Sequence, residues 1–473
     1  MRRWLVALGA LVAGWTMIGI PAHATYGARV TADEPHYLLT AISLGSDGDL
    51  DISDELADEA YRPFHSVDID PQTYPLDGSG RQVSPHDPLL PAVLAAPVRL
   101  GGWVAAKATL AVLAAALAML TAWTAVSRFG VRPRIALAVV AVFACTAPLA
   151  SYATQVYPEI PAALAVMAAV AALSGPLGRR GLSVCVVAVV VLPWLSIKYA
   201  PVAATLALAA LWRTRDRRPA AAVVGATLVL AAVAYAVVHQ AIYGGWTAYA
   251  TGDHFARSGQ FAVVGSSPNY LGRARRLVGL IVDDSFGIGA WMIGWLALPL
   301  AMGVLLRRRP VDWAILAMPL AAGWLTATFV ASTMHGWWWP GRQLVVVLPV
   351  AVIVIALAVD GSTMLVRLLA LSGVVGAATW MWTTVEAITR RHVLVVDFDQ
   401  TANPWMRVWR VVLPDGRDPT TADDVLSVVW VGCVLALVVI GWRVGGRDRA
   451  LSVEGGDCKV LLTPPATVPD TCR

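Results

Sequence analysis

Residues 103–126 read WVAAKATLAVLAAALAMLTAWTAV, and Lys107 is the only charged side chain among them. About 20 apolar residues in a row are enough to cross the roughly 30 Å hydrocarbon core of a bilayer as an α-helix. Comparable runs recur along most of the 473 residues. In lipid, each backbone polar group must be bonded within its own segment, which favours helices. The stretch therefore predicts an all-α, polytopic membrane protein.

The composition indicates the same class. Hydrophobic residues make up 58% of the chain and charged residues 14%, whereas a soluble domain has about 25% charged residues. The mean hydropathy is +0.64. The formal net charge of +5 comes almost entirely from Arg in short loops, a pattern that membrane topology requires. We therefore expect the lipid bilayer as a partner and no nucleic acid.

We expect about ten transmembrane helices and one re-entrant helical hairpin. The hairpin covers 182–212, which is too long for one span and is interrupted by LPWLSIKYAP at 192–201. Arg179 and Arg180 precede it and four Arg follow it, so the positive-inside rule places both ends in the cytoplasm. The expected spans lie roughly at 4–21, 103–126, 134–150, 159–175, 219–241, 287–305, 311–331, 342–359, 364–384 and 425–442.

The loop charges predict the topology. Basic loops on one side put both termini in the cytoplasm of a plasma-membrane protein. The long outer segments are then 22–87, 242–286 and 385–424, and 88–100 is a short interfacial segment. A membrane domain fills 1–445, and the polar, Pro-rich tail 446–473 is expected to be disordered. The first apolar run, followed by Ala22-His23-Ala24, also fits a cleaved signal peptide, although we expect it to be retained.

The first candidate site residues follow the first span, in Thr31-Ala32-Asp33-Glu34-Pro35-His36-Tyr37. Carboxylates at a bilayer surface can act as a base or hold a cation. A solvated loop that happens to contain acids is the alternative. Further acids run from Asp47 to Glu59, where solvation or a divalent cation site would account for them, although no EF-hand spacing is present.

Other polar residues are expected at the same outer surface. Glu159 opens a helix, where it could face Asp33 or simply interact with the helix dipole. His86 and Asp87, in SPHDP, could line the site or form a rigid turn. Arg342, in Trp339-Pro340-Gly341-Arg342-Gln343, could clamp a phosphate or mark the interface.

Lys198 and Tyr199 lie near the apex of the hairpin. A Lys at membrane depth faces protein or a water-filled cavity, and a lipid phosphate is its natural partner. His335 could ligate a metal together with Glu159 or only cap its loop.

Together these features resemble the GT-C superfamily of polytopic glycosyltransferases, which includes the protein O-mannosyltransferases and the lipid A aminoarabinose transferase. The matching features are the Asp33-Glu34 pair after the first span, Glu159, the broken hairpin, and Trp339–Gln343. The resemblance covers roughly residues 1–360. We expect no large C-terminal soluble domain of the kind that oligosaccharyltransferases carry, which favours the compact members of the superfamily.

The resemblance implies a function and roles. A sugar would pass from a polyprenyl-phosphate donor to the hydroxyl of a glycan, glycolipid or protein on the extracytoplasmic side, with inversion. Asp33, with Glu34 and Glu159, would be catalytic, and Asp33 the base. Arg342, Lys198 and Tyr199 would hold the donor phosphate. His36, His86, Asp87 and His335 would line the site. The crowded acids could also recruit a divalent cation, with Glu159 and His335 as candidate ligands.

Two other classes of function remain open. A lipid or envelope-precursor transporter would also have broken helices and intramembrane charge, but its acids should lie at the bilayer midplane. A non-catalytic envelope scaffold would tolerate the loss of Asp33. The sugar, which could be mannose, arabinose, galactose or glucose, stays undetermined.

Overall fold

The computed structural model describes residues 1–75, 80–246, 269–309, 313–331 and 333–454. In this part of the chain the protein is a helical bundle with one β-hairpin, whose two strands have two residues each. The first half contains α1 (Arg2–Met17), α2 (Glu34–Ser46), α3 (Ser53–Ala57), β1 (Tyr74–Pro75), β2 (Gln82–Val83), α4 (Leu89–Ser127), α5 (Pro133–Ala144), α6 (Leu149–Tyr152), α7 (Glu159–Leu173), α8 (Arg179–Leu195), η1 (Ile197–Tyr199), α9 (Ala200–Thr214) and α10 (Arg218–Tyr243).

The second half is more broken. It contains α12 (Tyr270–Ala274), α13 (Arg276–Val282), α14 (Ile288–Trp291), η3 (Ile293–Leu296), α15 (Ala297–Arg308), α16 (Trp313–Leu325), the π-helical turn η4 (Thr326–Val330), η5 (Arg342–Leu344), α17 (Leu348–Val359), α18 (Thr363–Ile388), η6 (Phe398–Gln400), α19 (Pro404–Trp409), η7 (Arg410–Val412) and α20 (Thr421–Glu454). Helix α20 thus runs past the boundary expected at residue 445, and 455–473 lie outside the described residues.

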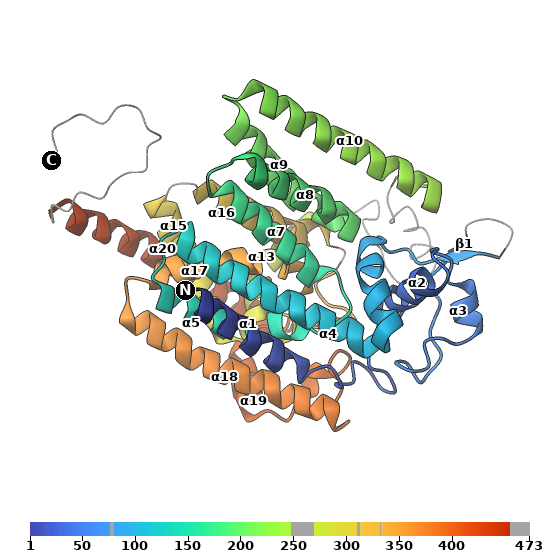
Figure 1. Cartoon of the computed structure of the whole chain (residues 1–473). Helices are drawn as coiled ribbons and strands as arrows, with labels where there is room; N and C mark the ends of the chain where they lie inside the picture. The colour runs from blue at the N-terminus through green and yellow to red at the C-terminus, as the bar shows by residue number, and fades with distance from the viewer. Residues whose placement is uncertain (76–79, 247–268, 310–312, 332, 455–473) are drawn as a thin grey trace.

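The core of the bundle is built around α4, α7 and α17. Helix α4 packs against α1, α2 and α7, α7 packs against α8, and α17 packs against α4 and α15 (Figure 1). Almost every residue of α7 and α17 is buried, as expected for short apolar helices with protein on all sides. Helix α10 lies on α8 and α9 at the periphery and exposes most of its apolar surface.

The helices have the length and composition of a multi-pass membrane protein. Five of those described could each cross a membrane: α4, α10, α16 with η4, α18, and Thr421–Gly446 of α20. Helices α5, α7 and α17 are apolar but shorter. The expected segment 88–100 forms the start of α4 and is set off by a break at Gly101 and Gly102, where Gly102 takes φ +61°, a conformation that Gly adopts at little cost.

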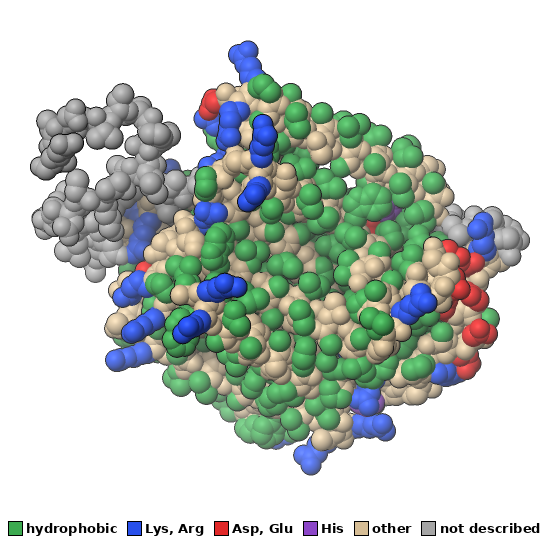
Figure 2. Space-filling model, in the orientation of Figure 1, with side chains coloured by type: hydrophobic (Ala, Val, Ile, Leu, Met, Phe, Trp, Pro, Cys, Tyr) green, Lys and Arg blue, Asp and Glu red, His purple; other side chains and the backbone are tan. Residues whose placement is uncertain are grey.

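Charges separate between the two ends of the bundle. On the face drawn in Figure 2, Asp and Glu gather at the end formed by α2 and α3, and Lys and Arg predominate at the opposite end, with hydrophobic side chains between. We call these the acidic end and the basic end. At the basic end, Arg128 and Arg213 donate to the carbonyls of Ala171 and Leu173, where α7 finishes.

The helical hairpin predicted at 182–212 is present as α8, η1 and α9. At the basic end of the hairpin, Arg217 donates to the carbonyl of Leu177. At the apex of the hairpin, Lys198 contacts Glu159, the first residue of α7. The hairpin therefore runs alongside the whole of α7, which is about 22 Å long at 1.5 Å per residue. Lys198 consequently lies at the acidic end.

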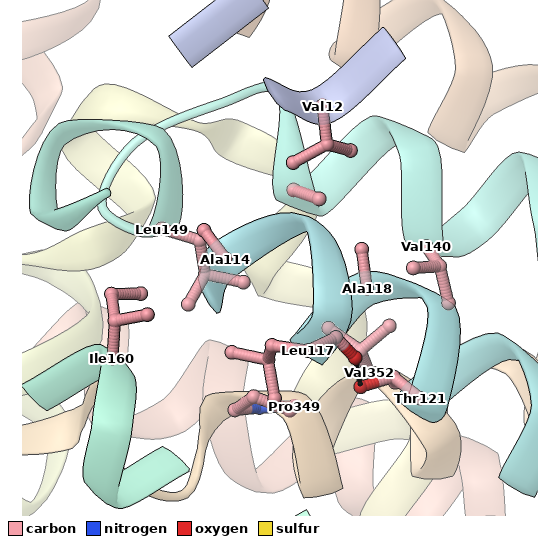
Figure 3. A pocket seen from close by; sticks show the side chains of 11 residues that line it. Val12, Ala114, Leu117, Ala118, Thr121, Val140, Leu149, Ile160, Pro349 and Val352 are labelled. Carbon is pink, nitrogen blue, oxygen red and sulfur yellow. Dashed lines mark hydrogen bonds between the residues drawn. The ribbon is translucent and has the colours of Figure 1, made fainter. Parts of the chain in front are cut away.

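An internal cavity between α1, α4, α5, α7 and α17 is apolar (Figure 3). Its volume is about 20 Å³, and the residues that line it include Val12, Leu117, Ile160 and Val352. The Thr121 hydroxyl donates a hydrogen bond to the carbonyl of Leu117. The cavity has room for about one water molecule, so it is a packing defect and is too small for a lipid chain.

Candidate active site

The segment around Asp33 places its carboxylate at the acidic end. Asp33 precedes α2, whose first turn contains Pro35, a residue suited to the start of a helix. An Asp in this place commonly accepts a bond from the first helical turn. The Asp33 side chain makes no such bond and instead accepts from Arg342 Nη2 over 2.8 Å. Ala32, just before it, has φ +51°, an unusual conformation for a residue with a Cβ.

Arg342 is placed by the glycine before it. Gly341 has φ +82°, and a Cβ there would lie 2.7 Å from Ile288 Cγ2, so this position accepts only glycine without rearrangement. The turn starts η5, and the Arg342 side chain is 8% exposed. Its guanidinium lies 4.0 Å from the ring centroid of Tyr157 and 5.4 Å from that of Trp338. Both distances lie within the roughly 6 Å range of a cation–π interaction.

Four charged side chains form one connected cluster at this point. Arg342 donates through Nε to Glu159 Oε1 over 2.9 Å and through Nη2 to Asp33. Lys198 Nζ donates to the same Glu159 oxygen over 2.7 Å. Glu159 is fully buried, and its Oε2 has no hydrogen-bond partner among the described residues. Two carboxylates and two cations therefore balance in a site whose most exposed carboxylate is Asp33, at 22%.

The charge on Asp33 is controlled by Arg342. Burial by itself would raise the pKa of the Asp33 carboxyl, but the Arg342 guanidinium, with smaller contributions from His86 and Lys198, outweighs burial and lowers this pKa to about 2. The carboxylate is therefore ionised at neutral pH and binds a proton only weakly. A group that displaced the guanidinium would return its pKa towards or above the ordinary value.

Glu34 does not lie at the exposed surface where the sequence placed it. Its side chain is buried, and its two oxygens accept from the backbone N–H of Thr31 at 2.9 Å and of Val156 at 2.6 Å. Burial raises its pKa. Because both oxygens are engaged with backbone, Glu34 joins the loop that carries Asp33 to the loop that precedes Glu159.

His36 and His86 border the cluster. The His86 ring stacks on Tyr37 with centroids 4.6 Å apart, and the two imidazole centroids are 6.4 Å apart. Burial lowers the pKa of His36 to about 3, so the ring is neutral and its Nε2 accepts from the backbone N–H of Gln72. Burial also lowers the pKa of His86, whose Nε2 has no partner in the described part of the chain.

Asp87 is buried and ties three elements together. Its Oδ1 accepts from Tyr235 at 2.9 Å and lies 2.8 Å from His239 Nε2, both on α10. Its Oδ2 accepts from the backbone N–H of Ile197 at 3.1 Å. Ile197 is the neighbour of Lys198, so Asp87 helps to fix the hairpin apex. The Tyr199 side chain is buried, and the centroid of its ring lies 5.1 Å from Lys198 Nζ.

The candidate metal ligands Glu159 and His335 have different partners. His335 Nε2 lies 3.3 Å from Asp283 Oδ2, and its ring packs against Phe286. Glu159 already faces two cations, Lys198 and Arg342. A divalent ion at Glu159 would be repelled by both charges. Glu159 and His335 therefore do not fit the divalent-cation site that the sequence suggested.

The sequence did not point to the aromatic residues that surround Arg342. Tyr157 and Trp338 flank Arg342, and the Tyr152 hydroxyl donates to the carbonyl of Trp339. Lys107 was also not among the candidates, although its buried ammonium donates to the carbonyl of Arg29. The available signal was proximity in sequence. Tyr152 ends α6 and Tyr157 lies in the loop between α6 and Glu159, while Trp338 and Trp339 precede Arg342.

No protein-family model matches this sequence, and no curated protein matches it. Among solved structures it is similar to ArnT from Cupriavidus metallidurans bound to undecaprenyl phosphate, with a TM-score of 0.53, 15% identity, and coverage of 95% of this chain and 78% of that one. The apo state of the same protein gives a TM-score of 0.49 and 14% identity over the same shares. At this identity the likeness shows the fold alone, an all-α polytopic bundle like that of ArnT.

Proposed function

We propose that this chain is a membrane glycosyltransferase that moves a sugar from a polyprenyl-phosphate donor to an acceptor hydroxyl on the extracytoplasmic side, with inversion at the anomeric carbon. The observation that carries the proposal is the cluster in which Arg342 bridges Asp33 and Glu159 while Lys198 contacts Glu159. It combines a partly exposed carboxylate with two cations at the acidic end of a membrane bundle.

The two cations suit a phosphate. A guanidinium binds phosphate oxygens through parallel N–H donors, and an ammonium adds a compact point charge. When the sugar leaves, the lipid phosphate gains negative charge, and preformed cations in a water-poor site stabilise that change. The solved ArnT structure was obtained with undecaprenyl phosphate bound, which supports a lipid phosphate as the ligand here.

Donor binding would also activate the base. Without donor, Arg342, together with His86 and Lys198, keeps the pKa of Asp33 at about 2, which is too low for efficient proton abstraction near neutral pH. A phosphate that takes over donors of Arg342 weakens this ion pair and raises the pKa of Asp33. The base would therefore become effective only when the sugar donor is present.

The proposed step is a single displacement. The acceptor oxygen attacks the anomeric carbon as its proton passes to an Asp33 carboxylate oxygen. The bond between the anomeric carbon and the phosphate oxygen breaks, and its electron pair leaves with the polyprenyl phosphate. Glu159 orients Arg342 and Lys198, and Glu34 holds the two loops together. Attack from the face opposite the phosphate gives the inversion.

The proposal is tested by comparing envelope glycans by mass spectrometry in four strains. These are a deletion strain and the same strain expressing wild type, Asp33→Asn or Asp70→Asn. Asp70 is an exposed acid in the same outer segment. A sugar that is missing in the deletion and restored by wild type and Asp70→Asn, but not by Asp33→Asn, is the expected result.

Membrane levels of all variants must be equal for this comparison. Full restoration by Asp33→Asn would overturn the role of Asp33 and favour a transporter or a scaffold. An unchanged glycan profile in the deletion strain would overturn the transferase activity itself.

A further inference from the structure

An open pocket lies where the segment after α13 meets the segment between α18 and α20. The residues that line it are Asp284, Asp399, Thr401, Met406, Arg407 and Arg410. Its volume is about 300 Å³, which is at the lower end of the range for small-ligand sites. Five of the six lining residues are polar or charged, so the pocket suits a hydrophilic ligand. We call it the α19 pocket, because Met406 and Arg407 lie in α19.

Arg410 makes one wall of the α19 pocket rigid. Its Nη1 donates to the carbonyl of Asp399 over 2.6 Å. Its Nη2 donates to Asp284 Oδ2 over 2.9 Å and to Ser285 Oγ over 2.7 Å. Arg410 therefore ties together two segments that are more than 100 positions apart in the chain. A wall that is fixed before the ligand arrives lowers the entropic cost of binding.

Two of the lining side chains keep their hydrogen-bonding capacity. Within the described residues, neither the Asp399 carboxylate nor the Arg407 guanidinium forms a hydrogen bond or an ion pair. Asp399 is partly exposed and Arg407 is exposed. A carboxylate offers acceptors only and a guanidinium offers donors only. The pocket therefore presents one group of each kind to a ligand, beside the rigid wall.

The α19 pocket adjoins the candidate active site. Phe398 precedes the pocket residue Asp399, and its ring centroid lies 5.7 Å from that of Trp339. The Trp291 ring packs against the same Trp339, with centroids 4.8 Å apart. Trp339 is three positions before Arg342. These aromatic contacts link the pocket wall to the turn that carries Arg342, so a ligand of moderate length could occupy both places.

The charges that line the pocket balance, with two carboxylates and two guanidinium groups. A strongly anionic or cationic ligand would therefore meet repulsion as well as attraction. A sugar hydroxyl both donates and accepts hydrogen bonds, and guanidinium N–H groups and carboxylate oxygens are matching partners. Met406 adds an apolar surface for the C–H groups of a sugar ring. An uncharged, polyhydroxylated ligand fits this combination best.

We propose that the α19 pocket binds an uncharged sugar residue of the acceptor, and that the acceptor is a neutral glycan. Asp399 would accept from sugar hydroxyls, Arg407 would donate to them, and Arg410 would hold the wall in place. This proposal rests on the proposed transferase function, because it concerns the acceptor of that reaction. Binding energy from a part of the substrate away from the reacting hydroxyl would help to orient that hydroxyl.

The first test measures binding without any transfer. Full-length protein in nanodiscs is applied to immobilised neutral oligosaccharides of mannose, arabinose, galactose or glucose, and to uronic-acid and phosphorylated oligosaccharides as anionic probes. We expect the wild type to bind at least one neutral probe more tightly than the anionic ones. Asp399→Asn and Arg407→Gln should each weaken that binding at least tenfold.

The matched controls are Asp418→Asn and Arg391→Gln. Each removes a charge from an exposed side chain between α18 and α20 but outside the pocket, and each should bind the neutral probe as the wild type does. Binding of undecaprenyl phosphate, measured by native mass spectrometry, should be unchanged in all four variants, because none of them alters the Arg342 cluster. Unfolding temperatures close to that of wild type would show that the variants are folded.

The second test uses the strain comparison described for the proposed function. Asp399→Asn and Arg407→Gln should restore the missing sugar only in part, whereas the two controls should restore it fully. Full restoration by both pocket variants would overturn the acceptor role of the pocket.

Three binding results would also overturn the proposal. These are no retention of any neutral probe, equal retention by wild type and both pocket variants, and a preference for the anionic probes. The proposed function would fail in a different way. A neutral probe that binds through Asp399 and Arg407, in a chain whose deletion leaves the glycans unchanged, would overturn the transferase activity and leave the pocket as a carbohydrate-binding site.

Discussion

Arg342 Nη2 donates to Asp33 Oδ2 over 2.8 Å, although the two residues are 309 positions apart in the chain. The contact joins the loop after α1 to the turn before α17. Against the effect of burial, the guanidinium makes the largest contribution to lowering the pKa of the Asp33 carboxyl, which is about 2. A phosphate that competes for Arg342 would therefore alter the proton affinity of Asp33.

The first prediction concerns Asp33. Asp33→Asn should reduce transfer by about 10²–10⁴-fold, the usual contribution of a general base. It should leave the binding of undecaprenyl phosphate within a few-fold of wild type, because Arg342 and Lys198 remain. Activity is measured with purified protein in nanodiscs, and binding by native mass spectrometry. Normal turnover by the variant would exclude Asp33 as the base.

The second prediction concerns the phosphate. Arg342→Ala should weaken the binding of undecaprenyl phosphate at least tenfold, because a charge-assisted hydrogen bond contributes about 1.5–3 kcal/mol. Arg342→Lys should restore only part of it, since Lys lacks the planar fork of donors. The matched control is Arg62→Ala, which removes a partly exposed Arg paired with Glu59 and Asp68. Equal dissociation constants for wild type and Arg342→Ala would contradict the clamp.

A third prediction separates Glu34 from the catalytic group. Glu34→Gln should lower stability by about 1–3 kcal/mol, because the amide can accept from only one of the two backbone N–H groups. Thermal unfolding measures this, with the exposed acid Glu59 changed to Gln as the control. Transfer should fall as the loops that carry Asp33 and Glu159 loosen. An unchanged melting temperature with lost activity would instead give Glu34 a direct chemical role.

The fourth prediction is a pH dependence. Asp33 must be ionised to accept a proton, so the rate falls as the pH drops through its pKa. In the free protein that pKa is about 2, and kcat/KM should stay flat down to about pH 4, because it reports the free enzyme. The acid limb of kcat should lie at higher pH, since kcat reports the donor complex. Coincident acid limbs would contradict activation by the donor.

The ion pair also links pH to stability. The pKa of Asp33 is lower in the folded protein than its ordinary value of 3.8, so the pair stabilises the fold above about pH 4 and loses this contribution as the pH falls towards 2. Arg342→Ala removes the pair. Its melting temperature should therefore fall less steeply than that of wild type over this acid range, provided that the variant is folded at neutral pH.

The membrane class, the helical hairpin and the first members of the site were all predictable from local sequence. Hydropathy is a property of about 20 consecutive residues, so the run at 103–126 and the break at 192–201 can be recognised without knowing their neighbours. Glu159 and Arg342 stood out because each begins an apolar segment, and Asp33 because it follows the first one. Lys198 stood out as a charge in the break of the hairpin. Their roles in the reaction remain predictions.

What the sequence could not supply was which of these groups meet. Glu34 looked like the equal of Asp33, yet it is buried on two backbone amides, and His335 pairs with Asp283 and not with Glu159. Such pairings depend on which helices pack together and in what register, and no local pattern encodes a contact between residues 183 or 309 positions apart. The sequence by itself determined a membrane bundle with charged residues at its surface, and the tertiary structure alone decided that four of them form a single balanced cluster.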